Sequence, residues 1–233
     1  LPLSVAAQKQ NGHAKQKSVK KELCLQLSSV RDLVHDINKH GTAEARWTSL
    51  LSRLHALGYT SVEAAWYDQE HGTFYNRKAK DFKADIEKAG MKVLSSHVNH
   101  GLTAEELASG DFTKALDWWK ICIADHKAAG MSYIVNPWRG LQKSLQERDV
   151  YWRFLNAIGT LWQEAGLSCG FHNHNYEFEK VEGQVMYDYM LEHTNPEYVF
   201  FQMDMYWTVR GASSPVEYFK RYPGRFKSFH CKD

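Results

Sequence analysis

The amino-acid sequence predicts an α/β fold in which a parallel sheet curves into a (β/α)8 TIM barrel. Three observations support this prediction: seven short apolar segments, helical segments between them, and glycines that end several of those helices. Strands that alternate with helices form parallel sheets. The first apolar segment is not followed by a GxGxxG pattern, which counts against an open dinucleotide-binding sheet.

The first expected strand shows a regular alternation of side chains. Leu23 and Leu25 would face helices, whereas Cys24 and Gln26 would face the interior of a barrel. Six further apolar segments have a similar length. The expected strands lie near residues 22–28, 60–66, 91–97, 132–136, 168–173, 199–204 and 226–230.

The segments between these strands have helical periodicity. Apolar residues recur at Ala45, Leu50 and Leu54, for example, on one face of a helix. The expected helical segments cover residues 42–57, 74–89, 112–129, 145–165, 185–193 and 215–221. Four of them are followed by a glycine, the residue that most easily adopts the left-handed conformation found at helix C-termini. These glycines are Gly58, Gly90, Gly130 and Gly166.

The two ends of the sequence raise expectations of their own. A TIM barrel has eight strands, and we expect the eighth beyond Asp233, so that residues 21–233 form one barrel domain that is C-terminally incomplete. We expect residues 1–20 to form a flexible tail. Its first residues, 1–8, resemble the end of a signal peptide. A trimmed N-terminus would look the same, so exported and cytoplasmic locations both stay open.

Composition excludes some classes of function. The net charge of +2 gives no argument for binding nucleic acid or an anionic membrane. Apolar runs stay well short of about 18 residues, so we expect no membrane span. The four cysteines have no CxxC spacing and do not decide the redox compartment.

Residue types that bind metals end three successive strands. His172 and His174 end the fifth, Asp204 the sixth and His230 the seventh. The two histidines of the fifth strand are two positions apart and therefore share a face. Because the carboxyl ends of barrel strands meet at one rim, these groups could bind a divalent metal. Hydrogen-bonded histidines at strand ends are the alternative explanation.

Four segments resemble the sugar phosphate isomerase/epimerase family, the xylose-isomerase-like TIM-barrel group that is also related to the apurinic endonuclease fold. They are HNHNYEF at 172–178, MDMYWTVRG at 203–211, PVEYFKRYPGRF at 215–226 and HCKD at 230–233. The segment QLSSVRD at 26–32 also resembles the family's first strand and loop, so the resemblance covers about residues 21–233. It implies one divalent metal ion, with Mn²⁺ first and Zn²⁺ or Mg²⁺ as alternatives. The implied ligands are His172, Asp204 and His230, and the family's fourth ligand is a Glu on strand eight.

The sequence departs from the family in its acid and base groups. Many relatives carry Glu where His172 stands and use two opposed glutamates for proton transfer. The candidate catalytic residues here are therefore His174, Glu63 and Lys232. The candidate substrate-binding residues are His97, Asn136, Trp138, Trp207 and Arg210.

The expected reaction is isomerisation or epimerisation of a sugar or sugar phosphate. A base would remove a proton next to a carbonyl that the metal polarises. A keto-sugar lyase or hydratase would use the same enolate, and a non-catalytic carbohydrate-binding barrel is a third reading. The expected partner is a small carbohydrate rather than nucleic acid, and the sequence leaves a homo-oligomer open.

Overall fold

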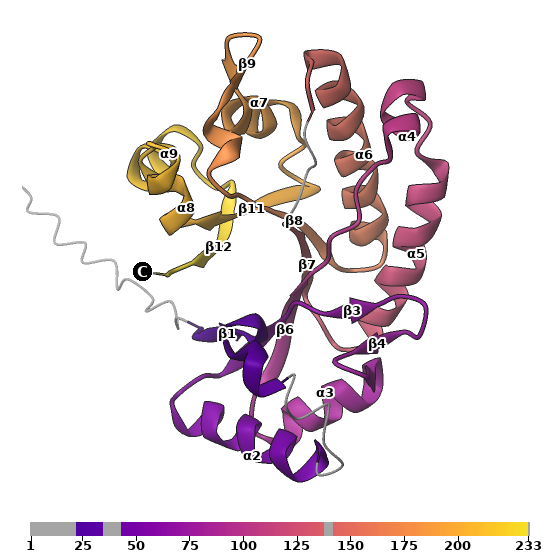
Figure 1. Cartoon of the computed structure of the whole chain (residues 1–233), viewed down its shortest axis with the longest axis vertical. Coiled ribbons are helices and arrows are strands. Elements are labelled where there is room, and N and C mark those ends of the chain that lie inside the picture. The colour runs from indigo at the N-terminus through magenta and orange to yellow at the C-terminus, as the bar shows by residue number, and fades with distance from the viewer. Residues whose placement is uncertain (1–21, 35–42, 138–141, 233) are drawn as a thin grey trace, which may run out of the picture.

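The computed structural model describes residues 22–34, 43–137 and 142–232. Within them, seven parallel strands form one curved sheet with helices along its outer side (Figure 1). All seven expected strands are present, and neighbours in the sheet are neighbours in the sequence of strands, as in a TIM barrel. The strands are β1 (Cys24–Gln26), β2 (Ser61–Ala64), β6 (Lys92–His97), β7 (Tyr133–Asn136), β8 (Ser168–His172), β11 (Val199–Asp204) and β12 (Phe226–His230).

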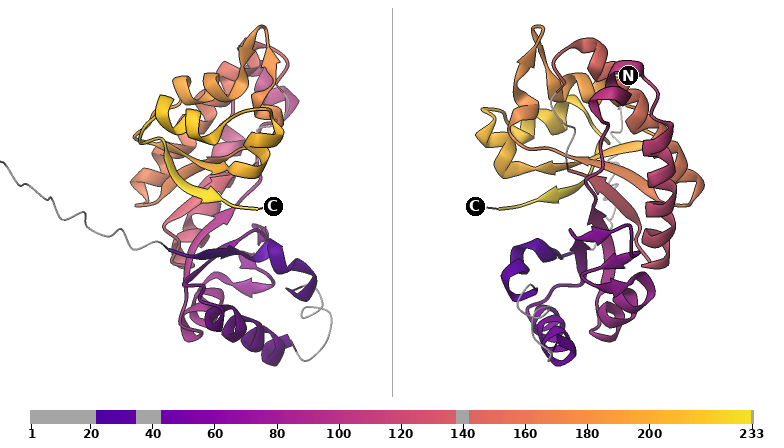
Figure 2. Two further views of the ribbon diagram at one scale, coloured as in Figure 1. Left: turned by 90° about the vertical axis from the view of Figure 1, so that its left-hand side faces the viewer. Right: turned by 45° about the vertical axis from the view of Figure 1, so that its right-hand side comes forward.

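The main helices match the expected segments. They are α2 (Ala43–Ala56), α3 (Ala79–Lys88), α5 (Thr113–Ala128), α6 (Leu145–Glu164), α7 (Met186–His193) and α9 (Pro215–Arg221). The views in Figure 2 show α5 and α6 running along the same side of the sheet. The glycines that follow α2, α3, α5 and α6 have positive φ angles of 95°, 84°, 76° and 80°, as expected for left-handed helix ends.

One expected helix is shorter than its segment. Residues 74–78 belong instead to a hairpin of β4 (Thr73–Phe74) and β5 (Arg77–Lys78), and β3 (Tyr67–Asp68) pairs with β4 to make a three-stranded antiparallel sheet. Two residues with positive φ form the turn, as a two-residue hairpin requires. The helical period continued backwards into this turn, and the prediction of a helix there was wrong.

Several short elements were not expected from the sequence. Two lie close to the carboxyl ends of the strands: α4 (Ala104–Ser109) and α8 (Met205–Arg210). The others are two turns of 3₁₀ helix and one more hairpin. These are η1 (Leu27–Val30), η2 (Tyr176–Phe178), β9 (Lys180–Val181) and β10 (Gln184–Val185).

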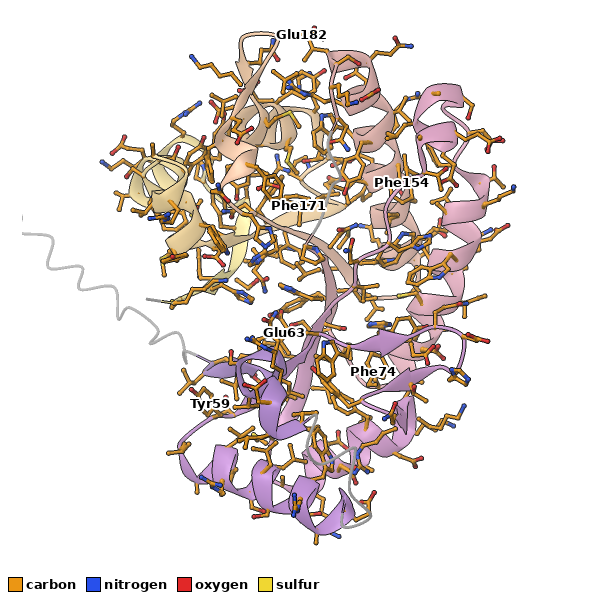
Figure 3. The ribbon with its side chains drawn as sticks, in the orientation of Figure 1. Tyr59, Glu63, Phe74, Phe154, Phe171 and Glu182 are labelled. Atoms are coloured by element: carbon orange, nitrogen blue, oxygen red, sulfur yellow. The ribbon has the colours of Figure 1, made fainter. Side chains whose placement is uncertain are left out.

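The two faces of the sheet differ in chemistry. On β2, Val62 is buried in the apolar layer beneath the helices, whereas Glu63 is buried on the concave side. Figure 3 shows Phe74 and Phe154 on the helical side of the sheet and Glu63 on the inner side. The apolar layer packs the fold, and the alternation of side chains along each strand leaves the polar residues inside.

Aromatic side chains pack closely against the strand β8. At Gly170 on β8, an added Cβ would lie 2.6 Å from the Phe200 ring. Phe200 in turn meets Tyr133 edge-on, with ring centroids 5.3 Å apart. Within the described residues, none of the helices has the length and hydropathy needed to cross a membrane. The tail at residues 1–20 lies outside the described residues.

Candidate metal and substrate site

A set of polar side chains converges at the carboxyl ends of the strands. Register brings them together, because opposed residues on neighbouring parallel strands point to the same side of the sheet. The opposed pairs are Gln26 with Glu63, His172 with Gln202, and Asp204 with His230.

Glu63 lies at the centre of this set and is 2% exposed. One carboxylate oxygen is 2.9 Å from Gln26 Nε2 and 2.8 Å from His230 Nε2, and the other accepts hydrogen bonds from Ser95 Oγ at 2.6 Å and Gln202 Nε2 at 2.9 Å. Burial alone would raise the pKa of Glu63, but the His97 and His230 imidazoles and these donors outweigh it and hold the pKa well below its usual range. Glu63 is therefore an ionised, fully hydrogen-bonded carboxylate.

The Gln202 amide decides which imidazole nitrogens carry protons. Its Nε2 must donate to the Glu63 carboxylate, because a carboxylate only accepts. Its Oε1 therefore accepts from His97 Nε2 at 2.6 Å and from His172 Nδ1 at 3.0 Å. His97 Nδ1 then accepts from Gln26 Nε2 at 3.0 Å. Both nitrogens of His97 are thus used, whereas the lone pair of His172 Nε2 stays free of these bonds.

Three imidazoles lie close together above Glu63. Ligand nitrogens of His97, His172 and His230 all lie within 4.8 Å of one another. Burial, followed by the charges of the other histidines, lowers the pKa of His172 well below its usual value. Burial likewise lowers the pKa of His97, although the charge of Glu63 acts in the opposite direction. Burial thus favours neutral imidazoles, the form that binds metals.

Asp204 completes the polar set from the end of β11. Its Oδ1 accepts the backbone N–H of Trp207 at 3.0 Å and so caps α8. Its Oδ2 lies 3.5 Å from His172 Nε2 and 2.7 Å from Lys232 Nζ. The structure therefore places Asp204 in contact with His172 and in register with His230, whereas the three side chains whose ligand atoms all lie within 4.8 Å of one another are His97, His172 and His230.

The predicted catalytic groups His174 and Lys232 border this set. The His174 ring is 5.0 Å from that of His172 and 5.8 Å from that of Trp207, while Lys232 Nζ lies 5.6 Å from the Trp207 ring centre. Burial and then the Lys232 charge lower the pKa of His174 to about 4. The backbone N–H of His174 donates to the Glu177 carboxylate at 2.7 Å, which fixes the turn after β8.

The other predicted substrate-binding residues have different positions. Asn136 is buried at the end of β7, where its backbone pairs with Phe171. Arg210 is exposed at the last residue of α8 and, among the described residues, takes part in none of the contacts above. Trp138 lies outside the described residues.

Comparison with known proteins agrees with this fold. Residues 51–233 match the family model of the xylose isomerase-like TIM barrel, a segment that includes six of the seven strands of the sheet. The chain belongs to this family. The resemblance seen in the sequence is thereby confirmed.

Several solved structures are similar to this chain. A sugar phosphate isomerase/epimerase from Parabacteroides distasonis is 30% identical with a TM-score of 0.79, over 94% of this chain and 77% of that chain. The probable 3-DHS dehydratase AsbF from Bacillus anthracis is 12% identical with a TM-score of 0.66, over 91% and 73%. The zinc-bound IOLI protein is 12% identical with a TM-score of 0.63, over 90% and 72%. The last two show likeness of fold alone, and no curated protein matches the chain.

Sequence reasoning missed three residues of this polar set. Gln202 and Ser95 were not considered as site residues, and Gln26 was assigned to the interior without a role. The signal was clear for Gln202, a polar side chain between the buried apolar residues Phe201 and Met203 on a strand. Gln202 stands two positions before Asp204 and therefore shares its face of β11.

Proposed function

We propose that the protein is a divalent-metal-dependent isomerase or epimerase of a sugar. The contact of His172 with Asp204 at 3.5 Å, together with the ligand nitrogens of His172 and His230 within 4.8 Å of each other, is the observation that carries the proposal. Family membership and the 30% identity with a sugar phosphate isomerase/epimerase support the reaction class.

The donor set fits a divalent cation. His172 Nε2 carries a lone pair and faces a carboxylate oxygen of Asp204 at 3.5 Å, and two acceptor atoms so placed repel unless a cation lies close by. The Lys232 ammonium group, 2.7 Å from the same oxygen, provides such a positive charge in this structure. His230 donates through Nε2 to Glu63, which leaves its Nδ1 as the second imidazole ligand atom. His97 is excluded as a ligand in this arrangement because both of its nitrogens are used.

We propose Mn²⁺ as the first candidate ion, following the resemblance. Two imidazoles with one carboxylate would also accept Zn²⁺, and the IOLI relative binds zinc. When bound, the ion would bind adjacent oxygens of a sugar and polarise its carbonyl group.

Side chains of the protein would position the ligands, transfer the proton and contact the sugar. Glu63 uses its lone pairs to hold Gln202 and His230, so we assign it to positioning these side chains. His174 and Lys232 border the ligands and are the groups we assign to proton transfer. One of these two side chains removes a proton from the carbon next to the carbonyl. When the proton is returned to the other carbon, the sugar is isomerised. When it is returned to the opposite face of the same carbon, the sugar is epimerised. Trp207 offers a ring for the apolar face of the sugar.

A solvent-exchange experiment tests the proposal. The protein loaded with Mn²⁺ or Zn²⁺ is incubated with a panel of aldoses and ketoses in D₂O, and NMR detects deuterium next to the carbonyl carbon. We expect deuterium in at least one recovered sugar and in its isomer or epimer. A dehydrated product instead would identify a lyase, and a bound sugar without exchange would identify a binding protein.

Two variants locate the activity. Asp204→Ala is expected to lose both metal and exchange, whereas His174→Ala is expected to keep the metal and slow the exchange. Asp117→Ala, which removes an exposed carboxylate on α5, is the matched control and should change neither. Full metal content in Asp204→Ala by elemental analysis would show that the site assignment is wrong.

A further inference from the structure

A cavity of about 640 Å³ opens beside His97, and neither His174 nor Trp207 is among its described lining residues. His97 lines this cavity and also belongs to the group of three imidazoles, so the cavity borders the predicted site at this side chain. We call it the aromatic cavity, after the rings of Trp66, Tyr67, Tyr75 and Trp118 that line it. Its volume lies within the range of about 300–1,000 Å³ typical of small-molecule pockets.

The antiparallel hairpin of β4 and β5 builds one wall of the aromatic cavity. Its two turn residues, Tyr75 and Asn76, have φ angles of 51° and 63°, a region that bulky side chains rarely adopt. Tyr75 is held there by packing, with its ring 5.3 Å from that of Trp66, and by its hydroxyl, which accepts the backbone N–H of Ala65 at 2.9 Å. The two-residue turn thus sets these φ angles, and the contacts of Tyr75 hold its ring in the wall of the cavity.

The polar groups of the aromatic cavity are suited to hydroxyl groups rather than to a phosphate. Asn76 and Asn99 are exposed and line the cavity, and each amide can both donate to and accept from a sugar hydroxyl. Among its described lining residues, the only side chain with a full charge is that of Asp68, which is negative. His71 contacts this carboxylate at 2.7 Å, and its hydrogen bonds keep the pKa of Asp68 below the usual value. The described lining residues therefore include no Lys or Arg side chain that could pair with an anionic group.

We propose that the aromatic cavity binds a second, uncharged sugar ring, and that the substrate is therefore a neutral glycoside rather than a monosaccharide phosphate. The inference rests on the proposed function for the first ring, which lies at the histidines. The glycosidic bond passes His97, the side chain shared by both spaces. The aromatic rings cover the apolar C–H face of the second ring, and the two asparagine amides bind its hydroxyl groups.

Binding to the protein labelled with ¹⁵N-tryptophan tests this without relying on turnover. The probes are trehalose, maltose, cellobiose and sucrose, compared with glucose and glucose 6-phosphate. The chain has eight tryptophans, and Trp66→Phe and Trp118→Phe assign the two indole signals. We expect at least one disaccharide to shift both signals and to bind more tightly than either glucose or glucose 6-phosphate.

Two variants separate the second ring from the first. Trp66→Ala should weaken the binding of that disaccharide by about 3- to 10-fold, the loss expected for one aromatic contact, and should leave glucose binding unchanged. Asn76→Gly should act in the same direction, because glycine keeps the positive φ without strain while the amide is lost. Trp207→Ala is the matched control at the other ring and should weaken disaccharide and glucose by the same factor.

Three results would overturn the inference. They are the absence of indole shifts with all four disaccharides, tighter binding of glucose 6-phosphate than of any disaccharide, and an equal loss of glucose and disaccharide binding in Trp66→Ala. Metal analysis and proton exchange on the same preparations keep the two proposals apart. A disaccharide that shifts Trp66 in a protein without metal affinity would refute the proposed function alone, whereas metal-dependent exchange restricted to monosaccharides would refute this inference alone.

Discussion

Buried histidines occupy two unlike regions of this barrel. His126 on α5 lies in the outer, apolar part, where its Nδ1 donates to the Cys122 carbonyl oxygen at 2.7 Å and its ring meets Tyr67 and Phe74 edge-on at 4.6 and 4.8 Å. His172 lies in the polar interior, bonded to Gln202 and facing Asp204. Both are almost completely buried, and burial lowers the pKa of both.

The difference shows that burial and a lowered pKa do not identify a functional histidine. His126 has aromatic neighbours and bonds through Nδ1 only to Cys122 of its own helix, so its neutral ring is a core side chain. The tautomer of His172 is fixed by the side-chain amide of Gln202 on the neighbouring strand, and its other ring nitrogen faces the Asp204 carboxylate. Partners that orient a lone pair toward other ligand atoms distinguish a metal site from a packed core.

The largest expected effect separates the two histidines directly. His172→Ala should lower the affinity for Mn²⁺ or Zn²⁺ by at least about 100-fold, since loss of even a supporting partner costs about 10- to 100-fold. His126→Leu should leave that affinity unchanged and lower the free energy of unfolding. Isothermal titration calorimetry and urea denaturation on both variants measure this. Equal metal affinity in His172→Ala and the wild-type protein would remove the distinction drawn above.

The next effect tests the orienting amide. Gln202→Met keeps the volume of the side chain but removes the hydrogen bonds to His97, His172 and Glu63. We expect metal affinity to fall by about 10- to 100-fold while circular dichroism shows a retained fold. An unchanged affinity would mean that packing alone orients the imidazoles.

A pH dependence sharpens the description of His126. Burial lowers its pKa from 6.5 to about 3, so below pH 6.5 the unfolded chain binds a proton that the folded protein does not. The free energy of unfolding therefore falls as the pH falls, and His126 should contribute a loss of about 2 kcal/mol at about pH 5.

Urea denaturation at about pH 7.5 and about pH 5 measures this loss. In His126→Leu the loss between the two pH values should be smaller than in the wild-type protein by about 2 kcal/mol. The difference between the two proteins isolates this residue from the interior histidines. Identical pH dependence would show that water reaches the His126 ring.

The smallest effect concerns redundancy around Glu63. Ser95→Ala removes one of the four hydrogen bonds to this carboxylate, the one of 2.6 Å, and leaves three in place. We expect the free energy of unfolding to fall by about 1 kcal/mol and metal affinity to change by less than about 3-fold. A loss of metal affinity as large as that of Gln202→Met would contradict the view that the remaining donors hold the carboxylate.

The fold could be predicted because local patterns and the barrel agree. Alternation along Leu23 to Gln26, helical periodicity in residues 42–57 and a left-handed glycine such as Gly58 are all local properties of the chain. Local patterns failed at residues 74–78, where the helical period of α3 continues into a hairpin whose turn is stabilised by packing of Tyr75 against Trp66.

The sequence by itself determined which residue types stand at the carboxyl ends of the strands, and so it pointed to His172, Asp204 and His230. Only the tertiary structure decided how they are bonded. Glu63 and Gln202 are 139 positions apart and meet solely because β2 and β11 face each other across the concave side of the sheet. That contact fixes the orientation of the amide, the amide fixes the tautomers of His97 and His172, and the tautomers determine which ring nitrogens keep a free lone pair. Such a chain of hydrogen bonds depends on side chains brought together by folding, and no local pattern in the sequence records it.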